Sequence, residues 1–231
     1  MKNDPSITAD FVTLANGFLG LLAIMYIIDG NFRLGMLLIL VAIIADGFDG
    51  ILARFFRREA GHGVYLDSIA DMVSFCFAPS ILLYGVYYDL DKGTSFQSLD
   101  NALTVTASML VVLFGILRLA RFVEKGYKTK AYMGLPTPAA ALFIVTLLAV
   151  VGNQFVVLGL SILISFLMIS RIDYPKLRGI LGWVAALVIV IGIMALFYPS
   201  DFSVYALAFS LAMASVYVVI GPYYEKWWKG E

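Results

Sequence analysis

Long apolar stretches, separated by short polar segments, run through almost the whole chain. Eight of them follow one another, at about residues 9–29, 33–57, 63–88, 99–124, 136–151, 154–171, 179–198 and 202–223. Most have the roughly 17–25 residues that a helix needs to cross about 30 Å of hydrocarbon. The residue-by-residue alternation of a membrane β-barrel is not seen. The pattern therefore predicts an all-α fold, a polytopic integral membrane bundle of about eight transmembrane helices.

Composition and charge refine this picture. Apolar residues make up 61% of the 231 positions, above the roughly 45–50% of soluble domains. The single Cys76 allows no disulfide framework within the chain. Of the 16 Lys and Arg residues, all but Arg33 and Lys92 fall at one end of the predicted helices. Positive residues gather on the cytoplasmic side of membrane proteins, so we expect that end and both chain termini to be cytoplasmic. The net charge of zero gives no reason to expect a nucleic-acid partner.

Four aspartates interrupt the apolar pattern near the predicted cytoplasmic ends of the second and third helices. Asp46 and Asp49 are three residues apart, and Asp67 and Asp71 are four apart, so each pair shares one helix face. The turn over residues 54–63 brings the two pairs to a similar depth on antiparallel helices. Carboxylates are costly to place near lipid, and four that converge repel one another. The pattern predicts a site for Mg²⁺ or Mn²⁺, and two ions would suit four carboxylates and phosphoryl chemistry.

Small residues lie between these aspartates. Gly50 and Ala53 leave one strip of the second helix nearly without side chains, and Gly63 opens the third helix in the same way. A phosphate-bearing ligand can therefore approach the backbone there. The alternatives are that the small residues only permit close helix packing, and that the aspartates form a structural salt-bridge cluster with nearby arginines.

The stretch from Asp46 to Asp71 resembles the signature of the CDP-alcohol phosphotransferase family. All the fixed positions of that signature are present, namely Asp46, Asp49, Gly50, Ala53, Arg54, Gly63, Asp67 and Asp71. The resemblance implies a membrane enzyme in which an alcohol attacks the phosphorus distal to cytidine of a CDP-linked lipid, and CMP leaves. It also implies that Asp46, Asp49 and Asp67 are metal ligands, while Asp71 both approaches the metal and takes the proton of the hydroxyl.

The same resemblance implies a set of contacts to the CDP-lipid. Within the motif this set comprises Asp49, Gly50, Ala53, Arg54 and Gly63. Thr13 and Asn16 in the first helix also resemble a family pattern whose polar residues reach the nucleotide. The alternatives are that Arg54 extends to lipid headgroups, and that Thr13 and Asn16 form hydrogen bonds between helices.

Two later segments narrow the resemblance. Residues 118–122, Arg-Leu-Ala-Arg-Phe, and residues 134–141, Gly-Leu-Pro-Thr-Pro-Ala-Ala-Ala, resemble the CDP-diacylglycerol–serine O-phosphatidyltransferases of bacteria and archaea. This implies CDP-diacylglycerol or CDP-archaeol as the donor and L-serine as the acceptor. Many relatives carry Asn directly after the first segment, where this chain carries Val123.

A serine acceptor carries a carboxylate, which the planar fork of an arginine can grip at two points. Arg118 and Arg121 are one helical turn apart, and we expect them to hold the acceptor, with Lys130 as a further candidate. Pro136 and Thr137 begin the next helix, whose free amide groups could bind an anion. The alternatives are a plain helix start and, for Arg121, a positive charge that only fixes membrane orientation.

We therefore expect metal-dependent transfer of a phosphatidyl or archaetidyl group to the hydroxyl of L-serine, with release of CMP. Inositol phosphate or glycerol phosphate as the acceptor stays open, because the same arginines could bind a phosphate. A carboxylate-lined cation transporter would explain the aspartates but not the fixed small residues. The prediction is one membrane domain over residues 1–231, with a catalytic core at about 9–171 and additional C-terminal helices at about 179–223. The protein would lie in the cell membrane with its site near the cytoplasmic face, and the resemblance implies a homodimer.

Overall fold

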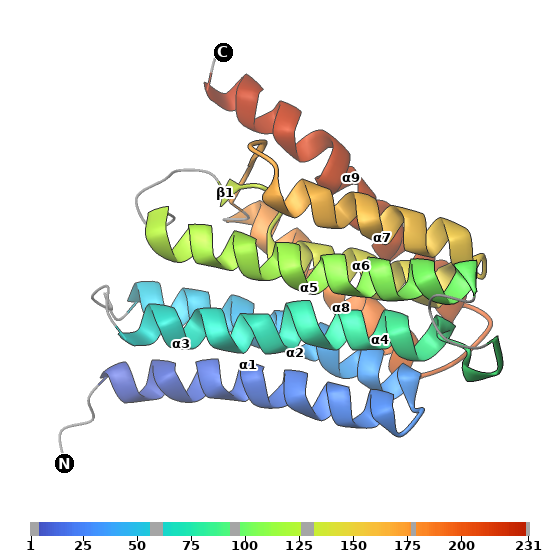
Figure 1. The fold of residues 1–231 in the computed structure, drawn as a ribbon. Helices are drawn as coiled ribbons and strands as arrows, with labels where there is room; N and C mark the ends of the chain where they lie inside the picture. The colour runs from blue at the N-terminus through green and yellow to red at the C-terminus, as the bar shows by residue number, and fades with distance from the viewer. Residues whose placement is uncertain (1–4, 56–61, 93–97, 126–131, 177–178, 230–231) are drawn as a thin grey trace.

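Helices that run roughly parallel or antiparallel to one another form nearly all of the structure (Figure 1). This computed structural model describes residues 5–55, 62–92, 98–125, 132–176 and 179–229. The helices are α1 (Pro5–Ile28), α2 (Phe32–Phe55), α3 (His62–Asp71), α4 (Ala78–Tyr87), α5 (Leu99–Lys125), α6 (Thr137–Val150), α7 (Gln154–Ile169), α8 (Ile180–Phe197) and α9 (Ser203–Lys229). A π-helical turn, η1 (Met72–Phe77), joins α3 to α4, and a 3₁₀ turn, η2 (Leu90–Lys92), precedes α5.

Each predicted apolar stretch coincides with a helical segment to within a few residues, except that α9 continues to Lys229. Within the described residues, five helical stretches are long and apolar enough to cross a membrane, at 11–28, 63–87, 99–124, 180–197 and 203–223. Helices α6 and α7 are apolar but shorter. An all-α fold with several membrane-spanning helices is confirmed, while the number of eight crossings and the side of the termini stay predictions.

Helix α6 lies at the centre of the bundle. Its sequence is apolar all round, as in a helix that is buried on every side. Ala141 and Val145 belong to one apolar core with α2, whereas Ala140 and Ile144 belong to a second core with α5 and α7. The single helix therefore joins both halves of the interior.

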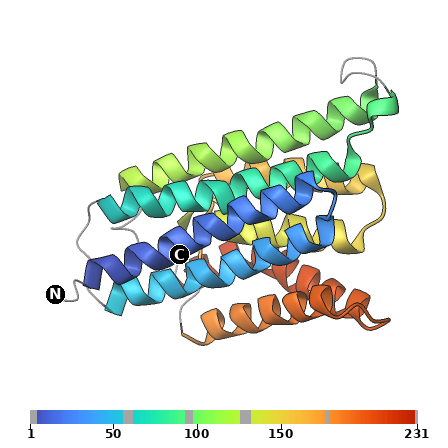
Figure 2. The same cartoon turned by 90° about the horizontal axis from the view of Figure 1, so that it is seen from below.

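The two C-terminal helices form a layer on one side of the bundle (Figure 2). Helix α8 packs against α2 and α9, and α9 packs against α6. Gly192 allows α8 to approach Leu40 of α2 closely. Arg33 at the start of α2 donates to the carbonyl oxygens of Leu196 and Phe197, at 2.6 and 3.2 Å, and so satisfies carbonyls that the end of α8 leaves free.

A short antiparallel ribbon was not predicted. Strand β1 (Tyr132–Met133) pairs with β2 (Asp173–Tyr174), and Tyr132 lies opposite Tyr174. Gly134 follows β1 with φ +79° and packs so tightly on the Met168 backbone that a side chain would not fit. Strands of two residues have no readable alternation, which is why the hydrophobic pattern did not reveal them.

Candidate active site

Three of the four aspartates, one from α2 and two from α3, come together beside α1. The carboxylates of Asp46, Asp67 and Asp71 each offer an oxygen, and these oxygens all lie within 4.8 Å of one another. Asp71 is buried, and Asp46 and Asp67 are half-buried. Carboxylates this close repel one another unless a proton or a cation lies between them. The all-oxygen set therefore fits a hard divalent cation.

The remaining motif residues surround this cluster in the sequence. Helix α2 continues through Asp49, Gly50, Ala53 and Arg54, whose side chains lie outside the described part of the chain. Gly63 lies in the first turn of α3 and is half-buried. The roles predicted for these five residues stay predictions.

Asn16 of α1 orients one of the aspartates. Its side-chain amide donates to Oδ1 of Asp71 at 3.2 Å. Asn16 is 1% exposed, and its own Oδ1 has no hydrogen-bond partner in the structure. Thr13, one turn earlier, is fully buried as well. A buried acceptor without a donor is unusual in a folded protein, so Asn16 fits a site that a bound group completes.

Ser74 in η1 holds the backbone of Asn16 in place, and the sequence alone did not identify this role. Its hydroxyl donates to the Asn16 carbonyl oxygen at 2.8 Å. Gly20 makes this approach possible, since a Cβ at that position would lie 2.6 Å from the Ser74 Cα. Segments of π-helix are rare and often occur at functional sites. Here the π-helical turn directly follows Asp71 and places Ser74 against α1.

Arg118 of α5 lies beside the cluster in a buried position, with 5% of its surface exposed. One guanidinium nitrogen donates to the Thr137 hydroxyl at 3.1 Å. The guanidinium carbon lies 5.3 Å from the ring centroid of Phe122 and 5.6 Å from that of Tyr132. Asp71 is its strongest charged neighbour. Arg118 is therefore a fixed, largely dehydrated cation next to the carboxylates.

The other residues predicted to hold the acceptor are placed differently. Arg121 is exposed and donates to the Ile169 carbonyl oxygen at 2.7 Å, where it caps the end of α7. Lys130 lies outside the described residues. Pro136 and Thr137 are both buried, and Thr137 is the first residue of α6. Of the predicted acceptor residues, Thr137 therefore contacts Arg118, whereas Arg121 instead contacts the end of α7.

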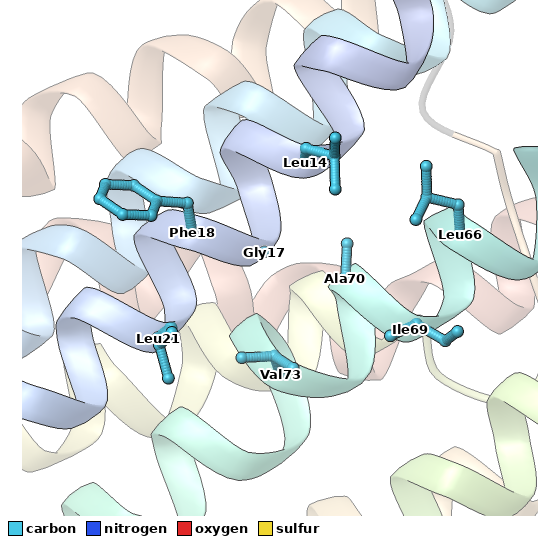
Figure 3. Close-up of a pocket in the computed structure, with 8 residues that line it drawn as sticks. All are labelled: Leu14, Gly17, Phe18, Leu21, Leu66, Ile69, Ala70 and Val73. Atoms are coloured by element: carbon cyan, nitrogen blue, oxygen red, sulfur yellow. The ribbon is translucent and has the colours of Figure 1, made fainter.

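An apolar groove of about 220 Å³ runs between α1 and the α3–η1 segment (Figure 3). Its lining residues are Leu14, Gly17, Phe18, Leu21, Leu66, Ile69, Ala70 and Val73. Gly17 directly follows Asn16, and Ala70 directly precedes Asp71. The groove therefore adjoins the polar cluster along both helices.

Known proteins are similar to this chain over most of its length. A family model described as CDP-alcohol phosphatidyltransferase matches residues 6–191. The chain is 34% identical over 187 residues to the archaetidylserine synthase of Methanothermobacter thermautotrophicus, covering 78% of this chain and 76% of that protein. It is 34% identical over 208 residues to the CDP-diacylglycerol–serine O-phosphatidyltransferase of Methanocaldococcus jannaschii, covering 90% of this chain and 83% of that protein. The Bacillus subtilis protein of the same name is 33% identical over 168 residues, covering 72% and 89%. The chain therefore belongs to the CDP-alcohol phosphatidyltransferase family, as the motif over residues 46–71 predicted.

Proposed function

We propose that this membrane enzyme transfers a phosphatidyl or archaetidyl group from a CDP-activated lipid to the hydroxyl of L-serine, with release of CMP. The observation that carries the proposal is the buried Arg118 beside the aspartate cluster. Arg118 can bind an anionic group of the acceptor. The neighbouring aspartates can bind a metal ion, which in turn can bind the pyrophosphate of the donor. Relatives named for serine transfer, at 33–34% identity, support serine as the acceptor.

On the donor side, Asp46, Asp67 and Asp71 would hold Mg²⁺ or Mn²⁺, with Asp49 as the fourth ligand that the motif implies. We propose two ions. When bound, they would neutralise the charge that builds on the pyrophosphate oxygens as CMP leaves. The unpartnered Oδ1 of Asn16 offers a further acceptor to the nucleotide or its ions.

Asp71 is the proposed general base. The amide of Asn16 binds its Oδ1, and this leaves Oδ2 to accept the proton from the serine hydroxyl. Ser74 fixes Asn16 in turn through the backbone. This chain of contacts holds the carboxylate in one orientation, and a correct orientation is a large part of what a catalytic group contributes.

Arg118 is the proposed partner of the serine carboxylate. The Thr137 hydroxyl and the rings of Phe122 and Tyr132 hold the guanidinium in place. A charge interaction gains strength where water is excluded. Binding the carboxylate here would place the serine hydroxyl close to Asp71, the carboxylate whose charge acts most strongly on Arg118.

The groove between α1 and α3–η1 is the proposed place for part of the donor's hydrocarbon, because it is apolar and adjoins the cluster. The proposal also includes an active site at the cytoplasmic face of the cell membrane, which follows from the distribution of Lys and Arg. A homodimer is included on family resemblance.

An acceptor screen with purified protein tests the proposal. CDP-diacylglycerol and CDP-archaeol are each combined with serine, inositol phosphate or glycerol phosphate, and CMP release is measured. We expect serine to be the preferred acceptor, with activity lost in excess chelator and restored by Mg²⁺ or Mn²⁺. Preference for a phosphorylated acceptor would contradict the serine assignment, and full activity in chelator would contradict the metal site.

A further inference from the structure

A second cation lies against the same aromatic ring as Arg118. The Nζ atom of Lys176 is 5.1 Å from the ring centroid of Tyr132, and the Arg118 guanidinium carbon is 5.6 Å from it. Arg118 is buried, whereas Lys176 is half-buried. The two charges therefore border one ring, with one of them toward the interior and the other closer to solvent. An anionic group placed beside this ring could interact with both cations.

The backbone before Lys176 is held firmly in place. The pairing of β1 with β2 sets Tyr132 opposite Tyr174, two residues before Lys176. The Tyr174 hydroxyl donates to the Val218 carbonyl oxygen at 3.2 Å, and the Tyr217 hydroxyl donates to the Pro175 carbonyl oxygen at 3.0 Å. Burial raises the pKa of the Tyr174 phenol, so it remains a hydrogen-bond donor at neutral pH.

Helix α9 supplies these contacts. Gly221 completes them, since a Cβ there would lie 3.3 Å from both the Tyr174 ring and Pro175. The family match ends at residue 191, before α9 begins. A helix beyond the residues that the family model matches thus fixes the segment that carries Lys176.

We propose that Lys176 is a specificity-determining residue of the acceptor site, which binds the anionic group of the incoming alcohol at the mouth and passes it to Arg118. This rests on the proposed function, in which that group is the serine carboxylate. The Tyr132 ring contacts both cations, and α9 holds the backbone that precedes Lys176. Loss of the Lys176 charge should weaken capture of the acceptor without changing the chemistry at Asp71.

The test measures kcat and KM for serine in Lys176→Met, which keeps the apolar stem against Tyr132 and removes the charge. We expect KM for serine to rise about fivefold to tenfold, which is up to about 1.4 kcal/mol, while kcat and the KM for CDP-lipid stay within about twofold. Lys176→Arg should restore a low KM. Arg171→Met is the matched control, because it removes an exposed charge from the same connection, and it should stay near wild type.

Serinamide, which lacks the carboxylate, separates charge recognition from a merely structural effect. Its KM should not rise in Lys176→Met. Tyr217→Phe, which removes the hydrogen bond to Pro175, should raise the serine KM in the same sense but by less. Lys176→Gln serves as a second variant if Lys176→Met does not fold.

The outcomes for the two proposals are distinguishable. The role of Lys176 would be overturned if the wild-type enzyme uses serine and the KM for serine is unchanged in both Lys176→Met and Lys176→Gln. An equal rise for serine and serinamide would also overturn it. If the wild-type enzyme rejects serine and uses a phosphorylated alcohol, the proposed function fails, and the same comparison with that acceptor decides whether Lys176 binds its anionic group.

Discussion

At the scale of single residues, Asp71 is the most constrained group of the site. It is buried, one of its oxygens lies within 4.8 Å of two other carboxylates, and Asn16 binds one of its oxygens. Asp71→Asn keeps the size of the side chain but removes the base, so turnover should fall by about 10²–10⁴-fold, the usual contribution of a general base. CDP-lipid binding should remain largely intact. Turnover and nucleotide affinity measured together check this, because a large loss of nucleotide binding would indicate mainly a metal-ligand role.

Arg118 provides the second prediction at this scale. Arg118→Lys keeps the charge but loses the two-point grip and the contact of a planar group with the rings of Phe122 and Tyr132. Serine binding should weaken by about 1.5–3 kcal/mol, with little change in CDP-lipid binding. Arg121→Lys is the control, since Arg121 contacts a carbonyl oxygen at the end of α7. Equal effects from both variants would contradict the assignment of Arg118 to the acceptor.

The sequence anticipated the residues whose spacing repeats on a helix face. Asp46, Asp67 and Asp71 lie together as the hairpin spacing predicted. Ser74 and Lys176 were not anticipated, because each acts through a contact to a residue more than forty positions away. Arg118 and Arg121 have the same residue type and similar surroundings in the sequence. Their different contacts depend on where α6 begins and where α7 ends in the folded bundle, which the local sequence around the two arginines does not specify.

At the scale of secondary-structure elements, the contact between α1 and η1 sets the position of Asn16. A Cβ on Gly20 would meet the Ser74 backbone, so Gly20→Ala should push the two segments apart and weaken the contact of Ser74 with Asn16. We expect a stability loss of about 1–3 kcal/mol and a clear loss of kcat. Unfolding in detergent and steady-state kinetics measure the two effects.

Gly159 offers the matched control for this variant. It also lies inside a helix, α7, but a Cβ there would meet nothing within 4 Å. Gly159→Ala should therefore be neutral or slightly stabilising, because alanine favours a helix over glycine. Ser74→Ala should not rescue Gly20→Ala, because the Ser74 Cα would still lie 2.6 Å from the new Cβ. Wild-type stability in Gly20→Ala would show that α1 and η1 can separate without cost.

The elements themselves were predicted with different success. Helices of about 14 residues or more carry a long apolar signal, and their bounds agree with the apolar stretches to within a few residues. The π-helical turn was predicted as ordinary helix, since a single additional residue per turn leaves no mark on an apolar run. The β1–β2 ribbon was also missed. Its two strands follow α5 and α7, and they pair only because the ends of these helices lie close together in the fold.

At the scale of the whole molecule, the remaining question is which end of the bundle faces the cytoplasm. Arg171 precedes α8, and Asp201 follows it, so one helix separates the two exposed positions. The native Cys76 is fully buried and should not react with a maleimide that cannot cross membranes. The wild-type protein therefore serves as the unlabelled background for single added cysteines.

Because the apolar pattern assigns all Lys and Arg residues except Arg33 and Lys92 to the end of the aspartate cluster, we expect that end to be cytoplasmic. In intact cells, Asp201→Cys should react with the impermeant maleimide, and Arg171→Cys should react only after the membrane is opened. The reverse pattern would place the site on the outer face and contradict the predicted orientation. Reaction of both cysteines in intact cells would mean that α8 does not cross the membrane, and the bundle would then have fewer crossings than the apolar pattern predicts.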